Sequence, residues 1–200
     1  MTRPDLAEEI LALIDEDERV RARLAADGSL FNGYHPEMEA VHRRNTARLR
    51  VIIAEVGWPG RSLVGERAAH EAWRIAQHSI GEPAFQREVL RLIEAAVAAG
   101  EAEARQAAYL EDRIRSFEGR FQRYGTQFDW DEDGQMSPFP PVEEPETVDA
   151  RRAAVGLGPL AENVARMRVG MAESNERPPA DLAERRREME AWARRVGWRA

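Results

Sequence analysis

The chain has 200 residues, of which 43% are hydrophobic, and a formal net charge of −7. This length and composition allow a sizeable core, so we expect a globular domain that needs no membrane. The negative charge argues against nucleic acid as a partner, because binding phosphates requires a basic surface. No apolar run approaches the length of a bilayer span, and the first residues lack a signal-peptide layout. We therefore expect no membrane partner and a cytoplasmic location.

Two residue types are missing from the sequence, cysteine and lysine, so all 29 basic residues are arginine. Without lysine there is no Schiff base, no anchor for pyridoxal phosphate and no P-loop lysine. Without cysteine there is no thiolate nucleophile, disulfide or thiolate metal site. Catalysis would depend on histidine, carboxylates, tyrosine, serine or threonine, or on a bound group, and we expect no cofactor.

The first half of the chain has the period of amphipathic helices. The opening helix carries a stripe of Leu6, Ile10, Leu13, Val20 and Leu24. Four further helices are predicted over residues 36–56, 64–79, 83–99 and 101–117. The stretch GWPG at 57–60 ends the second of them, because glycine terminates helices and a residue before proline avoids the α conformation.

After residue 119 the helical period gives way to alternation, which is typical of strands. We predict a strand over 121–130, a turn at DEDG and a returning strand over 135–139. Helical sequence resumes at 148–155 and again at 160–171. The expected fold class is therefore mainly α, a multi-helix domain with one small β-hairpin near residues 120–140.

The C-terminal part is expected to lie apart from the rest. We predict a single α-rich domain over 1–171, a linker at 172–179 and a terminal amphipathic helix at 180–200. The apolar face of that helix is formed by Leu182, Met189, Trp192 and Val196. An isolated helix of this length is marginal in water, so the face must be covered. We predict a homodimer contact, and the alternative is docking of the helix on its own chain.

Several predicted helices place a polar residue where the core stripe requires an apolar one. These residues are Asp17, Asn45, His78 and one of Asp112 and Arg113. Burying such a group without a partner costs about 1–3 kcal/mol, so we expect them to meet in one cavity or hydrogen-bond network. The alternative is that each has a local partner, such as Arg21 for Asp17 or the end of its own helix for His78.

The stretch FQRYGTQ, residues 121–127, combines amides, a hydroxyl and a phenol. Strand alternation would place Gln122, Tyr124 and Thr126 on one side, with Gln127 on the other unless a bulge turns it. Such a face suits a pocket wall that binds a small polar ligand. The alternative is a hairpin whose amides hold the loop backbone.

Five separated motifs occur in order along the chain. They are GWP with an upstream asparagine, QH, AYLEDR, QRYGTQ and RRAAVGL. This order resembles a bacterial domain family of unknown function over about residues 5–165. The resemblance implies family membership and carries over the motif positions, namely Asn45, Gly57, Trp58, Pro59, Gln77, His78, Asp112, Arg113, Gln122, Tyr124, Gly125, Thr126, Gln127, Arg151 and Arg152.

Other chemistries find less support in the sequence. Glu66, His70 and His78 share one helix, but eight residues rotate the face by about 80° and Arg74 intervenes, so we expect no metal site. No serine lies in a nucleophile elbow. General acid/base chemistry at His78 remains, because histidine titrates near neutrality.

We therefore expect a metal-independent enzyme, a hydrolase or transferase, that acts on a small polar or anionic molecule. The predicted catalytic residues are His78, Asp112 and Tyr124, with Asp112 or Asp17 orienting the imidazole. The predicted substrate-binding residues are Asn45, Arg113, Gln122, Thr126, Gln127, Arg151 and Arg152. The alternative is a noncatalytic binding or interaction module with a buried polar network.

Overall fold

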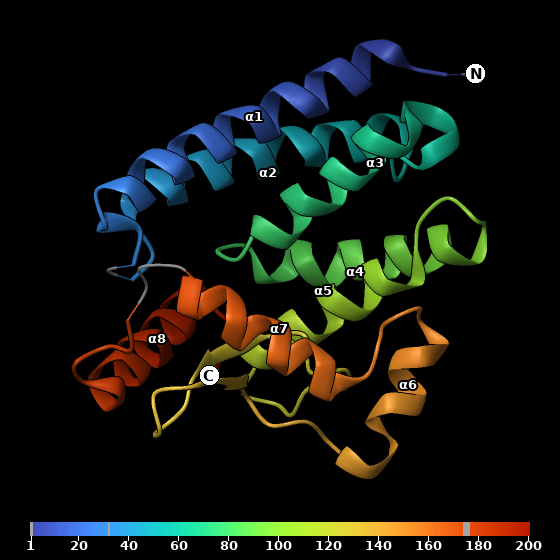
Figure 1. Ribbon diagram of the computed structural model, residues 1–200. Helices are drawn as coiled ribbons and strands as arrows, with labels where there is room; N and C mark the ends of the chain where they lie inside the picture. The colour runs from blue at the N-terminus through green and yellow to red at the C-terminus, as the bar shows by residue number, and fades with distance from the viewer. Residues whose placement is uncertain (1, 32, 174–176) are drawn as a thin grey trace. The chain divides into compact units, whose positions relative to one another are not determined.

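Four amphipathic helices make up the first of two compact units in the computed structural model, which describes residues 2–31, 33–173 and 177–200 (Figure 1). Unit 1 spans 1–103 and unit 2 spans 104–200. The single domain expected over 1–171 stays a prediction. Among the described residues, no helix is long and apolar enough to cross a membrane.

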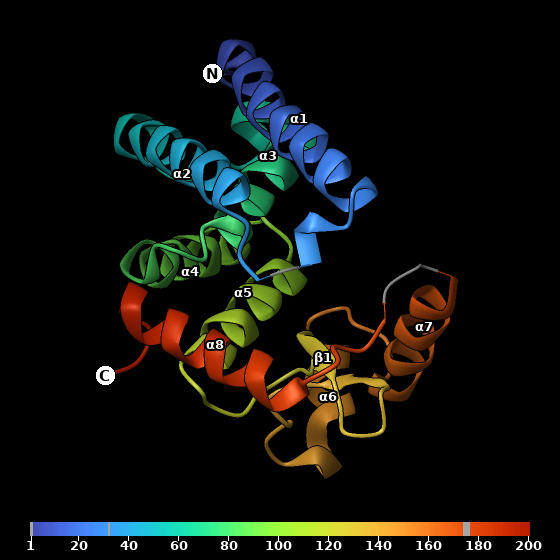
Figure 2. The same ribbon diagram turned by 90° about the vertical axis from the view of Figure 1, so that its left-hand side faces the viewer.

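Unit 1 confirms the first four predicted helices. They are α1 (Pro4–Ala26), α2 (Pro36–Val56), α3 (Arg61–His78) and α4 (Pro83–Ala98), with a 3₁₀ turn, η1 (Ser29–Phe31), after α1. Proline occupies the first turn of α1, α2 and α4, where its missing N–H costs no helix hydrogen bond. Both views place α1 beside α2 and α3 (Figures 1 and 2).

The buried stripe of α1 differs from the prediction at one position. Ile14, not Leu13, lies in the core, while Leu13 is half-buried. The helical period explains the change, because Ile10, Ile14 and Asp17 follow one another at spacings of four and three. Asp17 keeps its predicted place on the stripe and is 1% exposed.

Two glycines with positive φ shape the connection between α2 and α3. Gly57 has φ 76° and caps α2, as the GWPG stretch predicts. Gly65 has φ 80° inside α3 and kinks it one turn after its start. Only glycine takes this conformation without strain. The straight part of α3 therefore runs from the kink to His78, its last residue.

Unit 2 combines four helices with a short hairpin. Its elements are α5 (Ala104–Phe117), β1 (Phe128–Trp130), β2 (Met136–Pro138), the 3₁₀ turn η2 (Pro145–Thr147), α6 (Val148–Ala154), α7 (Leu160–Glu173) and α8 (Leu182–Val196). The two strands pair antiparallel with Asp129 opposite Ser137, and α7 packs beside β2. The predicted fold class, mainly helical with one hairpin, is confirmed.

The first strand of the hairpin is shorter than predicted. Residues 121–127 form a loop instead of a strand, with a single bridge between Gln122 and Val142. Gly125 has φ 64°, and a Cβ there would lie 2.8 Å from a Leu160 methyl carbon. The chain turns tightly at this glycine, so strand alternation does not set the directions of the side chains at 122–127.

The terminal helix α8 packs within unit 2. The rings of Trp192 and Trp198 each lie 5.3 Å from the ring of Phe117, and both tryptophans are buried. Arg199 donates to the carbonyl oxygens of Phe117 and Ser116. These contacts favour docking on the same chain, the alternative considered above, over the predicted homodimer contact. Part of the predicted linker at 172–179 lies outside the described residues.

We predict that Trp192→Ala lowers the free energy of unfolding by about 3 kcal/mol or more, as loss of a buried aromatic side chain does. Chemical denaturation checks this value, with exposed Val169→Ala as a control that changes it by less than about 0.5 kcal/mol. If α8 instead covered a second copy, the wild-type unfolding midpoint would rise with protein concentration, which contradicts docking on the same chain.

Candidate functional site

A buried carboxylate joins three helices of unit 1. Asp17 on α1 accepts a hydrogen bond from His78 Nδ1 on α3, with 2.9 Å between Nδ1 and Oδ2. The same Oδ2 lies 3.2 Å from Nε2 of His42 on α2. The side chain of His78 is 22% exposed, whereas that of Asp17 is 1% exposed. Part of the His78 side chain therefore reaches solvent while Nδ1 is bound to a buried carboxylate.

Electrostatics keep Asp17 ionised in this position. Burial raises the pKa of a carboxyl group, but the contacts with His42 and His78 outweigh burial and hold the pKa of Asp17 well below its usual range. Asp17 is therefore a buried anion stabilised by the His78 N–H and by its contact with the His42 ring. The predicted local partner, Arg21, is not what satisfies it.

His42 extends the contacts of Asp17 to a phenol. Its Nδ1 lies 2.8 Å from the hydroxyl of Tyr34, and the two rings stack with centroids 5.7 Å apart. Burial, with the charges of Glu39 and Asp17, raises the pKa of Tyr34, so its hydroxyl keeps its proton. Sequence reasoning missed His42 and Tyr34, since neither belongs to a motif. The spacing of His42, four residues after buried Met38, was the available signal.

Further polar contacts connect α2 to its neighbours. Asn45, which is 1% exposed, donates from Nδ2 to the carbonyl oxygen of Leu13 on α1 at 3.0 Å. Thr46 Oγ1 lies 2.7 Å from Oγ of Ser79, the residue after His78. Asn45 Oδ1 is buried and has no hydrogen-bond partner among the described residues. Asn45 thus binds a backbone carbonyl of α1, and its predicted place in one network with His78 stays a prediction.

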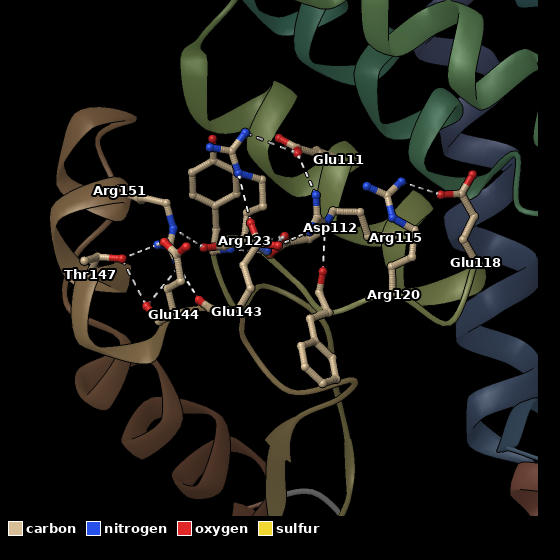
Figure 3. A network of polar contacts seen from close by, with 12 residues as sticks. Glu111, Asp112, Arg115, Glu118, Arg120, Arg123, Glu143, Glu144, Thr147 and Arg151 are labelled. Carbon is tan, nitrogen blue, oxygen red and sulfur yellow. Dashed lines mark hydrogen bonds and ion pairs between the residues drawn. The ribbon is translucent and has the colours of Figure 1, made fainter.

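In unit 2, the carboxylate of Asp112 organises the loop of residues 121–127. Asp112 is 0% exposed and accepts hydrogen bonds from the backbone N–H groups of Arg123, Tyr124 and Thr126 at 2.7–3.2 Å. The hydroxyl of Thr126 also donates to it at 3.0 Å. Burial raises the pKa of Asp112 against the opposing effect of these hydrogen bonds. Figure 3 shows the polar network around this residue.

The amides of the same loop bind backbone groups as well. Gln122 is fully buried, and its Nε2 donates to the carbonyl oxygens of Gln127 and Pro140. Its Oε1 accepts from the Gln127 N–H at 2.7 Å. Gln127 in turn donates from Nε2 to the hydroxyl of Thr126. These contacts match the alternative considered for FQRYGTQ, in which amides hold the loop.

Two arginines of α6 also bind this loop, through its backbone carbonyl oxygens. Arg151 donates to the carbonyl oxygens of Arg123 and Glu143. Arg152, which is 2% exposed, donates to the carbonyl oxygens of Tyr124 and Gly158. Both guanidinium groups therefore have backbone partners, and their role in binding an anion stays a prediction.

An ionic network joins this loop to α5 and to Glu143. Arg123 places Nη1 and Nε 3.5 Å from carboxylate oxygens of Glu111 and Glu143, and Arg115 also pairs with Glu143 (Figure 3). The ring of Tyr124 lies 5.7 Å from the Arg123 guanidinium, and burial raises the pKa of its phenol. Arg113 is half-buried on α5.

The predicted site residues thus fall in two units. Unit 1 holds Asn45 and His78. Unit 2 holds Asp112, Arg113, Gln122, Tyr124, Thr126, Gln127, Arg151 and Arg152. The prediction that both sets share one network stays a prediction. Among the described residues, the side chains grouped as candidate metal ligands are Asp17, His42 and His78, a set without Glu66 or His70.

We predict that Asp112→Asn lowers the free energy of unfolding by about 1–3 kcal/mol, because an amide has one acceptor oxygen for four donors. Asp133→Asn, on the exposed hairpin turn, is the matched control and should be close to neutral. Equal unfolding free energies for the two variants, measured by chemical denaturation, would show that Asp112 does not hold the loop.

Comparison with known proteins identifies a family for most of the chain. A model of a family of unknown function, DUF6624, matches residues 4–172, and this agrees with the resemblance found in the motifs. Neither the curated proteins nor the solved structures gave a match. The chain therefore belongs to the DUF6624 family, a family of unknown function.

Proposed function

We propose that this protein is a small-molecule enzyme in which His78 is the general acid/base and Asp17 holds its imidazole. The observation that carries the proposal is the 2.9 Å hydrogen bond between a buried carboxylate and a partly exposed imidazole. A carboxylate in this position fixes the tautomer and stabilises the imidazolium that forms when the ring takes up a proton.

The chemistry follows from the two ring nitrogens. With the Nδ1 proton donated to Asp17, Nε2 of His78 carries the lone pair that accepts a proton from a substrate or water. The protonated ring then returns that proton to a leaving group. Such proton transfer contributes about 10²–10⁴-fold to a rate, which suits a hydrolase or a transferase.

Asp17 takes the orienting role in this proposal in place of Asp112. The carboxylate of Asp112 already accepts from three backbone N–H groups and one hydroxyl. The catalytic role predicted for Asp112 and Tyr124 thus finds less support than that of His78. The proposed substrate remains a small polar or anionic molecule, and the proton transfer itself requires no metal.

A noncatalytic module is the alternative function. The observation in its favour is that His42, Asn45 and Thr46 of α2 are all buried and contact Asp17, Leu13 and Ser79 respectively, as in a network that only holds three helices together. The two functions differ in the role of His78. In an enzyme this residue transfers protons during turnover, and in a noncatalytic network it stabilises the folded protein.

We predict that His78→Asn abolishes turnover, by about 10²-fold or more, while the melting temperature stays near that of the wild type. A panel of chromogenic esters, phosphate esters and amides, assayed in EDTA, supplies the activity measurement. His70→Asn, on the same helix and outside the cluster, is the control and should keep wild-type turnover.

The same experiment separates the two functions. A large fall in melting temperature for His78→Asn, with no wild-type turnover on any substrate of the panel, favours the noncatalytic network, because buried partners are then left unpaired. Wild-type turnover that survives His78→Asn would refute the acid/base role.

A further inference from the structure

Three potential ligand atoms for one ion come together around Asp17. Asp17, His42 and His78 each offer one atom, and these atoms all lie within 4.8 Å of one another. Oδ2 of Asp17 is 2.9 Å from His78 Nδ1 and 3.2 Å from His42 Nε2. With bonds of about 2.0–2.2 Å from zinc to nitrogen or oxygen, neighbouring ligand atoms of a tetrahedral ion lie about 3.3–3.6 Å apart. The two separations from Oδ2 are shorter than this by a few tenths of an ångström, so small side-chain shifts would bring these atoms to that geometry.

Two buried atoms of this cluster have unused bonding capacity. His42 Nε2 lies within ion-pair distance of Asp17 but makes no hydrogen bond, and Asp17 Oδ1 has no hydrogen-bond partner among the described residues. Buried polar atoms are usually satisfied. A water molecule is one group that would satisfy Oδ1. A cation bonded to the carboxylate and to Nε2 satisfies both residues.

The other ring nitrogen of His42, Nδ1, has the kind of hydrogen-bond partner that metal-binding imidazoles usually have. Nδ1 lies 2.8 Å from the Tyr34 hydroxyl, whose oxygen can accept the Nδ1 proton. Histidine ligands usually donate their other N–H to such an outer partner, which fixes the tautomer and the ring orientation. In this arrangement Nε2 presents its lone pair to the space beside Asp17.

We propose that Asp17, His42 and His78 bind one divalent first-row transition-metal ion, with Zn²⁺ as its most accessible probe. Two imidazoles and one carboxylate favour such ions, whereas Mg²⁺ and Ca²⁺ prefer oxygen ligands throughout. Three protein ligands leave a coordination position for water or a small ligand. The expectation of no metal rested on Glu66, His70 and His78 of a single helix, whereas the ligands proposed here come from α1, α2 and α3.

This inference uses the side chains of the proposed function but does not depend on any turnover. In the ion-free protein a proton on His78 Nδ1 bonds to Asp17, and in the ion-bound protein the metal takes the place of that proton. The two forms compete for the same atoms. Metal binding is therefore measured without substrate, and turnover is measured in EDTA, so that failure of one proposal leaves the other standing.

The test is isothermal titration of the metal-stripped 200-residue chain with Zn²⁺ and, separately, with Mg²⁺. We expect one Zn²⁺ per chain for the wild type and for the control His70→Gln, and no heat of binding with Mg²⁺. Loss of an outer hydrogen bond costs about 10–100-fold in affinity, so His42→Gln and His78→Gln should each lose at least about 100-fold. Zn²⁺ should raise the melting temperature of the wild type and of His70→Gln, but not that of His42→Gln or His78→Gln.

Tyr34→Phe keeps all three ligands and covers the case in which a ligand variant fails to fold. We expect about 10–100-fold weaker Zn²⁺ binding for it, since only the partner of His42 is removed. Absence of Zn²⁺ binding to the wild type would overturn the proposal. So would binding that His42→Gln and His78→Gln retain, or binding that His70→Gln loses, because the ion would then sit elsewhere.

Discussion

The buried carboxylate of Asp17 is the constraint on which the arrangement of unit 1 depends. It interrupts the apolar stripe of α1, and it is stable there because imidazoles from α2 and α3 face it. Breaking a buried charged contact by removing one partner is far more costly than an ordinary surface change. The same contact gives His78 a fixed orientation beside solvent. The contacts of Asp17 therefore account both for how α1, α2 and α3 are held together and for the proposed role of His78.

Unit 2 has its own buried carboxylate with a different use. Asp112 binds backbone N–H groups, and Arg152 binds backbone carbonyl oxygens of the same loop. A loop that cannot pair its backbone in a sheet needs such partners, because buried peptide groups are rarely left unsatisfied. Motif residues of the loop are thus accounted for by folding, whereas the motif residue His78 is partly exposed and held by Asp17.

Helical periods, prolines and glycines in the sequence predict the helices well, because the signals are local. The first predicted strand, residues 121–130, does not form over 121–127. There the backbone N–H groups bind Asp112 of α5 and not a neighbouring strand, which no pattern within 121–127 indicates. Asp17 is recognisable as a polar residue on an apolar stripe. Its partner His42 is harder to recognise, since the contact joins three helices and the spacing of His42 after Met38 indicates burial but not the contact itself. For the same reason the sequence did not indicate Asp17, His42 and His78 as one group of candidate metal ligands.

The most direct measurement of the central claim, that Asp17 fixes the imidazole of His78, is long-range ¹H–¹⁵N NMR of the histidine rings in EDTA. The account predicts a His78 ring protonated at Nδ1, with a proton signal shifted by its hydrogen bond to the carboxylate, and loss of that state in Asp17→Asn. It also predicts that His70, outside the cluster, is unchanged by that substitution. A His78 ring that shows the same tautomer and titration as His70, in both the wild type and Asp17→Asn, would contradict the account.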